Sequence, residues 1–172
     1  MEGFHGRRTI QTMPIKHILL PEYNFVYTQF HGLVEDLDVR AWVDRMNKEL
    51  AGFNGCCEII DLSGEVDFSR LSSETLTQAG SREKERPTAG SGPLAILVSN
   101  PLTFGLARAY SSLIGEARTE VRILYSLDEC LAVMDLSENQ RIQVGKRIQL
   151  QGLSPSSSEA SRPIDFSFPP DE

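Results

Sequence analysis

The stretch Pro93–Pro101, "PLAILVSNP", decides the fold of this chain. It begins with an almost continuous apolar run, which is typical of a strand whose two faces are both covered within a sheet. Asn100 and Pro101 then favour the start of a helix, because Asn caps free N–H groups and Pro has no N–H to leave unpaired. The stretch therefore predicts a buried strand that leads directly into a helix.

The chain continues with a second unit of the same kind. We expect the helix that starts at Asn100 to end or bend at Gly115, and residues 119–126, "TEVRILYS", alternate as a strand does. Ser126 and Glu129 then form a capping box, which predicts another helix. The buried stripe of the helix after Asn100 is expected to consist of Leu102, Leu106, Ala109, Tyr110 and Leu113.

The residues before this stretch predict another strand and helix. Residues 56–62, "CCEIIDL", form an apolar run that indicates a strand. After a short link, Ser72 is the expected N-cap of a helix, with Leu71 and Leu76 as a hydrophobic staple across it. We expect this helix to end by Gly80, where the polar stretch "GSREKERPTAGSG" begins, and the mixed charges of "SREKERP" indicate a solvated loop or helix end.

The N-terminal part of the chain predicts a hairpin and a first helix. Two runs rich in β-branched and aromatic residues within 15–32 flank "PEYN", which is a turn signal. The helix that follows has Asp36 as its expected N-cap and ends at Gly52 or Gly55. The order of elements is therefore β-β-α-β-α-β-α-β-α.

This order predicts a single α/β domain over residues 15–136, with a mainly parallel sheet of four or five strands, an N-terminal β-hairpin and about four helices. Residues 137–172 are expected to form a C-terminal extension. Within it, "RIQVGKRIQLQ" fits a strand pair or an edge strand, or equally an extension of the last helix. The Ser-, Pro- and acid-rich end of the chain predicts a disordered tail.

Composition excludes several classes of partner. The net charge of −7 and the pI near 5.0 argue against nucleic acid or an anionic membrane surface. The sequence has no apolar run long enough to span a membrane and no apolar signal-peptide region near its N-terminus. We therefore expect a soluble cytoplasmic protein. Cys56, Cys57 and Cys130 are expected to be small buried apolar residues.

No cofactor or metal site is expected. The three histidines, His5, His17 and His31, have no second ligand at a spacing typical of metal sites. The chain also lacks the glycine-rich loops that bind nucleotides and the GxSxG turn of serine hydrolases.

The position of polar residues indicates where a ligand or partner would bind. In open parallel sheets, the carboxyl ends of the strands lie along one rim, and ligands bind there. Helix starts on this rim favour anions, and Arg108 and Gly105 would present a cation and an open approach near one of them. The opposite interpretation is that the polar residues only cap helices, that Arg108 faces solvent and that Gly105 is a close packing point. The candidate binding residues are Asp61, Ser63, Asp67, Ser69, Ser72, Asn100, Gly105 and Arg108.

Two segments resemble a known family. "EIIDLSGEVDFS" resembles the third strand of STAS domains, the sulfate-transporter and anti-sigma-factor-antagonist modules, and "LAILVSNPLTFGLARAYSSL" with "VRILYSLDECLAVM" resembles the second half of small bacterial STAS-like proteins. These proteins are related in fold to CRAL-TRIO lipid-binding domains. The resemblance covers residues Ile15 to Met134. It implies helices packed mainly on one side of the sheet and a binding or regulatory module rather than an enzyme.

The resemblance also implies where a phosphorylation switch would lie. In phospho-regulated members, a Ser or Thr directly after an Asp begins the helix beyond this strand. Aligned from Asp61, that position holds Arg70 here, so Ser69 and Ser72 are the remaining candidate acceptors.

The sequence therefore predicts a non-catalytic binding or regulatory module. It would recognise a protein partner, or a small lipid-like, apolar or anionic ligand, at the strand-end rim. The alternative is an uncharacterised enzyme that uses Asp61, Asp67 or His31 as acid–base groups. An edge strand, from the first hairpin or from "RIQVGKRIQLQ", would also allow a homodimer.

Overall fold

The computed structural model describes residues 13–86 and 92–153. The predicted C-terminal tail, from Ser154 onward, and residues 87–91 of the predicted polar stretch lie outside the described residues. Within the described ranges, no helix has both the length and the apolar character needed to cross a membrane.

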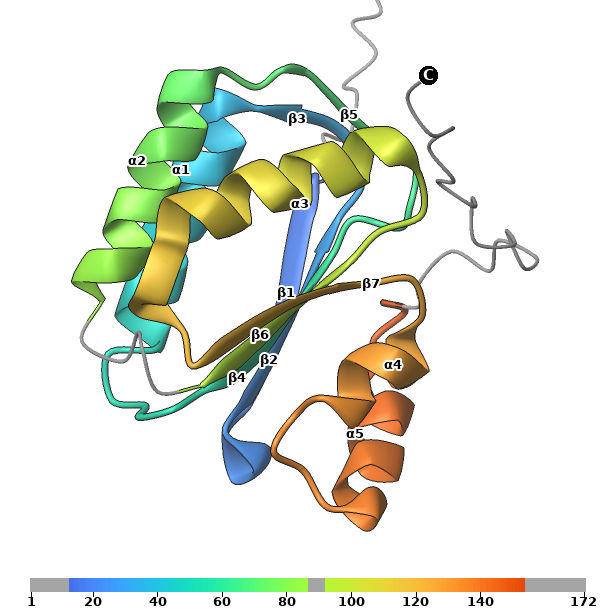
Figure 1. Cartoon of the computed structure of the whole chain (residues 1–172). Coiled ribbons are helices and arrows are strands. Elements are labelled where there is room, and N and C mark those ends of the chain that lie inside the picture. Colours follow the sequence, from blue (N-terminus) through green and yellow to red (C-terminus); the bar gives the residue numbers. More distant parts are fainter. Residues whose placement is uncertain (1–12, 87–91, 154–172) are drawn as a thin grey trace, which may run out of the picture.

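The main sheet has five strands in the order β1-β2-β4-β6-β7 (Figure 1). Strand β1 pairs antiparallel with β2 around a short 3-10 turn, and the other neighbours are parallel. The predicted N-terminal hairpin and mostly parallel sheet are therefore confirmed. The strands are β1 (Ile15–Leu20), β2 (Phe25–Phe30), β4 (Cys57–Asp61), β6 (Pro93–Leu97) and β7 (Glu120–Leu124).

A second, two-stranded ribbon was absent from the sequence prediction. Strands β3 (Gly32–Glu35) and β5 (Val66–Arg70) pair in parallel, and β5 occupies most of the stretch that was expected to be a link. Both strands are short and partly exposed, so they carry little of the apolar alternation that marks a strand in the sequence.

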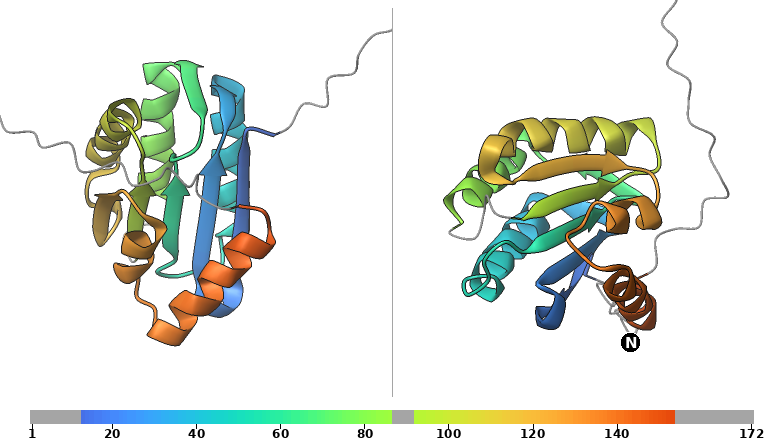
Figure 2. Two further views of the ribbon diagram at one scale, coloured as in Figure 1. Left: turned by 90° about the vertical axis from the view of Figure 1, so that its right-hand side faces the viewer. Right: turned by 60° about the horizontal axis from the view of Figure 1, so that its bottom comes forward.

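Five α-helices in the described residues cover the two faces of the sheet (Figures 1 and 2). Helices α1 (Asp36–Glu49), α2 (Ser73–Glu85) and α3 (Pro101–Ile114) lie on one face, and α4 (Leu127–Ala132) and α5 (Glu138–Leu150) lie on the other. The connections from β2 to β4, from β4 to β6 and from β6 to β7 thus each pass through one helix, and all three helices lie on the same face of the sheet. The fold is α/β, as predicted.

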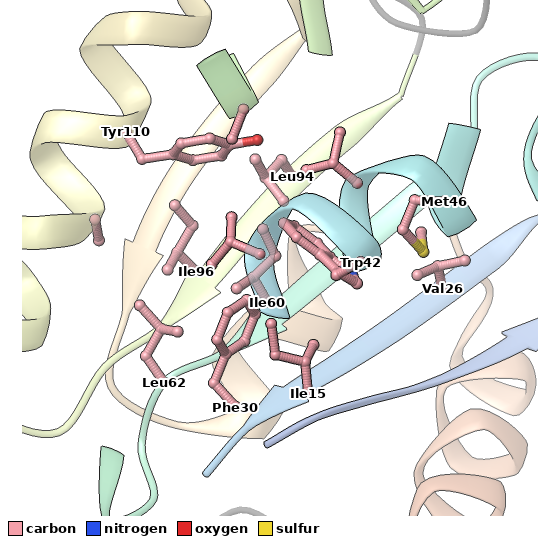
Figure 3. Close-up of a cluster of buried hydrophobic side chains, with 14 of the residues drawn as sticks. Ile15, Val26, Phe30, Trp42, Met46, Ile60, Leu62, Leu94, Ile96 and Tyr110 are labelled. Carbon is pink, nitrogen blue, oxygen red and sulfur yellow. The ribbon is translucent and has the colours of Figure 1, made fainter. Parts of the chain in front are cut away.

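The core consists of two apolar clusters, one on each face of the sheet. Alternate residues of a strand point to opposite faces, so Ile60 belongs to the cluster under α1–α3 and Ile59 to the cluster under α4 and α5. Trp42 from α1 and Tyr110 from α3 extend over the sheet from two helices (Figure 3). The second cluster continues through Leu153.

The segment "RIQVGKRIQLQ" is helical, so of its two predicted alternatives the strand was wrong. It forms most of α5, which begins at its own capping box of Ser137 and Gln140 and is separate from α4. Val144 and Ile148 are buried one helical turn apart. This segment therefore supplies no edge strand for a dimer.

Helix α2 is longer than predicted, and its end is buried rather than solvated. It continues past Gly80 to Glu85, and Gly80 lies against the Leu113 side chain of α3. Glu83 and Arg86, both within the stretch predicted to be solvated, are buried. A small residue at position 80 lets α2 approach α3 closely, which explains why glycine does not end the helix.

Helix α3 buries the predicted stripe only in part: Tyr110 is buried and Leu106 and Leu113 are half-buried. Thr103, Ala107, Tyr110 and Ile114 face the core, whereas Leu102 is 69% exposed and Ala109 is also exposed. The Thr103 hydroxyl donates to the Asn100 carbonyl oxygen at 3.1 Å, so this polar side chain is satisfied inside the helix and can be buried.

The start of α1 also differs from the prediction. Glu35 is the N-cap, in a capping box with Asp38, while Asp36 is the first residue of the helix. Asp36 instead receives hydrogen bonds from Ser72 at the start of α2.

Candidate functional site

The carboxyl ends of β2, β4, β6 and β7 meet at one edge of the sheet, as the rim prediction requires. The order of these strands never reverses along the sheet. The crevice used by doubly wound folds forms where the strand order reverses, so this sheet offers no crevice of that kind. A binding site on the rim would therefore be formed by the side chains at the strand ends and by the β3–β5 ribbon, and not by a crevice in the sheet.

Asp61 ends β4 as predicted, but it is completely buried. One carboxylate oxygen accepts from the backbone N–H and the hydroxyl of Ser63 at 2.8 and 2.6 Å. The other accepts from the Tyr27 hydroxyl at 2.5 Å and from the Gln29 amide at 3.1 Å. Four donors satisfy this carboxylate, so it stabilises the strand ends rather than facing a substrate.

The surroundings of Asp61 make nearby groups harder to ionise. Burial, followed by the charge of Asp61, raises the pKa of the Tyr27 hydroxyl far above its usual value. The same two causes raise the pKa of the Cys130 thiol to about 12. At neutral pH the phenol remains a proton donor to Asp61 and the thiol remains neutral.

Asp67, Ser69 and Arg70 lie together on β5 and are exposed. Asp67 accepts from the backbone N–H of Ser69 at 2.8 Å, and this bond, with a second from the Ser69 hydroxyl, lowers the pKa of Asp67. Arg70 donates to Glu35 of β3 at 2.7 Å, and Glu35 raises the pKa of Arg70. These charges are accessible to a partner.

Ser72 holds the starts of α1 and α2 together. Its side chain accepts from Thr75 N at 3.1 Å, which confirms the predicted N-cap. Its backbone N–H and hydroxyl both donate to Asp36 at 2.8 Å, and these bonds lower the pKa of Asp36. A phosphate on Ser72 would place charge against the Asp36 carboxylate and remove the cap.

The other predicted rim residues have separate places. Asn100 caps α3 in a capping box with Thr103, and Ser126 caps α4 with Glu129, as predicted. Arg108 is exposed on α3. Gly105 is also exposed, and a Cβ at this position would meet no atom within 4 Å. The prediction that Gly105 is a close packing point is therefore wrong.

The three proposed acid–base groups have different environments. Asp61 is buried and fully hydrogen-bonded, whereas Asp67 is exposed on the ribbon. His31 is half-buried, and burial, followed by the charge of Lys16, lowers its pKa. Within the described chain, no three His, Cys, Asp or Glu side chains are grouped so that they could hold a metal ion.

An apolar cavity of about 50 Å³ lies beneath the rim, between the sheet and helices α1–α3. Phe30, Ile60 and Ile96 of the sheet form its floor, and Trp42 and Tyr110 contribute to its walls. Figure 3 shows these labelled side chains pointing toward one another over the sheet. The lining residues that remain half-buried are Phe68, Leu71, Leu76 and Leu106.

Large apolar side chains are exposed close to the elements of the rim. Leu33 of β3 is 40% exposed, and Leu37 in the first turn of α1 is 77% exposed. Leu102 lies in the first turn of α3 and is 69% exposed. Tyr125, directly after β7, is 61% exposed and stacks on Phe104 with ring centroids 6.3 Å apart. Protein interfaces typically have an apolar centre surrounded by polar and charged residues.

Sequence reasoning missed a buried charge cluster at the opposite end of the strands. Arg118 donates to Glu83 at 2.6 Å, to the Cys56 carbonyl oxygen at 3.1 Å and to Glu58. Arg86 pairs with Glu83 at 3.1 Å. Burial alone would lower the pKa of Arg118, but Glu58 and Glu83 raise it. The one available signal was Glu58 itself, a charge within an otherwise apolar strand, which requires a buried partner.

Comparison of the chain with protein-family models, with curated proteins and with solved structures finds no match.

Proposed function

We propose that this chain is a non-catalytic binding or regulatory module, similar to STAS domains, that recognises a partner protein at the rim. The surface concerned consists of the β3–β5 ribbon and the first turns of α1, α2 and α3. The observation that carries the proposal is the combination of exposed Leu33 and Leu37 with the accessible charges Asp67 and Arg70.

The size of the apolar cavity beneath the rim bears on the choice between a protein partner and a lipid-like ligand. An engineered cavity of about 150 Å³ binds benzene. The cavity beneath this rim is about 50 Å³, too small for a ring or an acyl chain unless the helices move. A lipid-like ligand is thus the less supported version. An anionic ligand would depend on Arg70 or Arg108, both on the open surface.

The environment of Asp61 supports a binding role over acid–base chemistry. A catalytic carboxylate has to reach substrate, whereas all four hydrogen bonds to Asp61 come from within the domain. Among the candidate phospho-acceptors, Ser69 is the more accessible, because it is exposed beside Arg70, while Ser72 is already bonded to Asp36. A phosphate on Ser69 would repel Asp67 and compete with Glu35 for Arg70.

The test is affinity capture from lysate of the source cells, with the wild-type chain and two charge-reversal variants. Arg70→Glu alters the rim, and Arg122→Glu alters an exposed arginine on the edge strand β7. We expect a captured protein to be lost with Arg70→Glu and retained with Arg122→Glu. Equal capture by both variants would contradict a binding role for the rim.

A further inference from the structure

The apolar cavity beneath the rim has an entrance on one side. Most of its lining residues are fully buried, but Phe68 on β5, Leu71 and Leu76 around the start of α2, and Leu106 on α3 are half-buried. We infer that these four side chains border the entrance, because they line the cavity and are also partly exposed to solvent. The entrance therefore lies between the β5–α2 connection and α3.

The lining and volume of the cavity restrict what can enter it. A trapped water needs two to four polar partners, and this lining is hydrophobic and aromatic, so neither water nor an anion is favoured. At about 50 Å³ the cavity has room for roughly one or two methyl-sized groups. The tip of an aliphatic side chain fits, whereas a ring or an acyl chain does not.

So small a contact cannot hold a free ligand tightly, because binding also costs translational and rotational freedom. It becomes effective when the aliphatic group belongs to a larger partner that also contacts the surrounding surface. Protein interfaces are commonly anchored in this way, by one side chain in a pocket with a polar surround. Arg70, whose side chain is 66% exposed, directly precedes Leu71 at the entrance.

We propose that this cavity receives the tip of one aliphatic side chain, Leu, Ile or Met, from a partner protein, and that Arg70 pairs with an acidic residue beside that anchor. The inference rests on the proposed function, since it specifies how the rim recognises its partner. The exchange of Glu35 for a partner carboxylate leaves Arg70 paired in both states.

The test uses N-acetyl-leucinamide as the probe and methyl-detected NMR of the full chain. We expect the methyl signals of Leu71, Leu76 and Leu106 to shift with a dissociation constant on the order of millimolar, and the probe to show contacts to these methyl groups. N-acetyl-glycinamide should cause no shift.

A probe with glutamate after the leucine should bind roughly 2- to 5-fold more tightly than one with lysine, and Arg70→Ala should abolish this difference.

Two valine variants on α3 provide the matched comparison. Ala107→Val adds two carbon atoms to the cavity lining, and Ala109→Val makes the same change at an exposed position on the same helix. We expect Ala107→Val to eliminate the probe shifts and Ala109→Val to retain them. If Ala107→Val disturbs the fold, the direct probe-to-methyl contacts in the wild-type chain decide the question without it.

The contrary outcomes are distinct. Shifts with decanoate but not with N-acetyl-leucinamide would overturn the side-chain anchor in favour of an acyl ligand, and the absence of shifts with both would overturn any occupant. If capture depends on Arg70 but is unaffected by Ala107→Val, the anchor fails and the proposed function stands. If the probe enters the cavity but partner capture is unchanged in Arg70→Glu, the proposed function fails.

Discussion

The two ends of the parallel strands use charge in opposite ways. At the amino end, Glu58, Glu83, Arg86 and Arg118 are buried against one another. At the carboxyl edge, Arg70 and Glu35 form an exposed pair, with side chains 66% and 44% exposed. Buried charges must keep their partners, because an unpaired buried charge is costly, whereas an exposed pair can be exchanged at little cost. The amino end is therefore suited to hold the fold, and the carboxyl edge to bind.

The largest effect is expected from breaking the buried cluster. Arg118→Ala would leave Glu58 and Glu83 buried without their main partner, so we expect a loss of about 3–5 kcal/mol in the free energy of unfolding. Urea denaturation measures this change. The control is Arg122→Ala, which removes an exposed arginine paired with Glu120 and should cost less than about 1 kcal/mol. Similar losses for both variants would contradict the structural role of the cluster.

The next effect concerns Asp61, the buried carboxylate at the carboxyl edge. Asp61→Ala would remove the acceptor for Tyr27, Ser63 and Gln29, and we expect a loss of about 2–4 kcal/mol because buried donors are left unsatisfied. Thermal unfolding followed by circular dichroism would show it. Asp67→Ala, at an exposed position, should change stability very little. A stable Asp61→Ala protein that has lost only partner binding would instead make Asp61 a binding residue.

These two regions also differ in how far the sequence reveals them. The position of Asp61 at a strand end follows from a local apolar run, and the caps at Ser72, Asn100 and Ser126 follow from residues close to each cap in the sequence, so all were predictable. The charge cluster joins residues 35 and 60 positions apart, and no local pattern records such a pairing. Without its partners in view, the stretch containing Glu83 and Arg86 is indistinguishable from a solvated helix end.

The rim was predictable in place but not in form. Parallel strands imply that their carboxyl ends meet at one edge, which located the candidate surface. The β3–β5 ribbon was not foreseen, because Asp67, Ser69 and Arg70 are poor strand residues and are stabilised there by pairing with β3. The cavity was likewise unforeseen, since it depends on how three helices pack over the sheet.

A smaller effect, with a pH dependence, is expected where the two helix starts are joined. Ser72→Ala removes the N-cap of α2 and a hydrogen bond to Asp36, so we expect a loss of about 1 kcal/mol at neutral pH. Ser73→Ala, at the exposed next position, is the matched control and should have little effect.

The sign of the pH dependence follows from Asp36. Hydrogen bonds from Ser72 lower the pKa of Asp36 below its usual 3.8, so their contribution is present above that value and is lost as the pH falls through the lower folded-state pKa. Ser72→Ala keeps the backbone N–H that donates to Asp36 and removes only the hydroxyl, so the pKa of Asp36 should rise part of the way toward 3.8 and acid unfolding should begin at a slightly higher pH. Carbon-detected NMR titration of the Asp36 carboxyl group would measure this, and an unchanged pKa would show that the Ser72 hydroxyl does not stabilise the Asp36 carboxylate.

The smallest effect on stability is expected at the residue assigned the largest role in binding. Arg70→Ala removes an exposed ion pair with Glu35, which contributes little to stability and less in high salt. Partner capture should nevertheless fall, because the proposed recognition of an acidic partner residue requires the exposed guanidinium of Arg70, next to Leu71 in the chain. The free energy of unfolding and partner capture should therefore respond separately to the two variants. Arg118→Ala should lower the free energy of unfolding and affect capture only because the protein unfolds. Arg70→Ala should lower capture in a protein that is almost as stable as the wild type. A large loss of stability in Arg70→Ala would show that the carboxyl edge holds its charges for the fold, as the amino end does, and would remove the distinction between them.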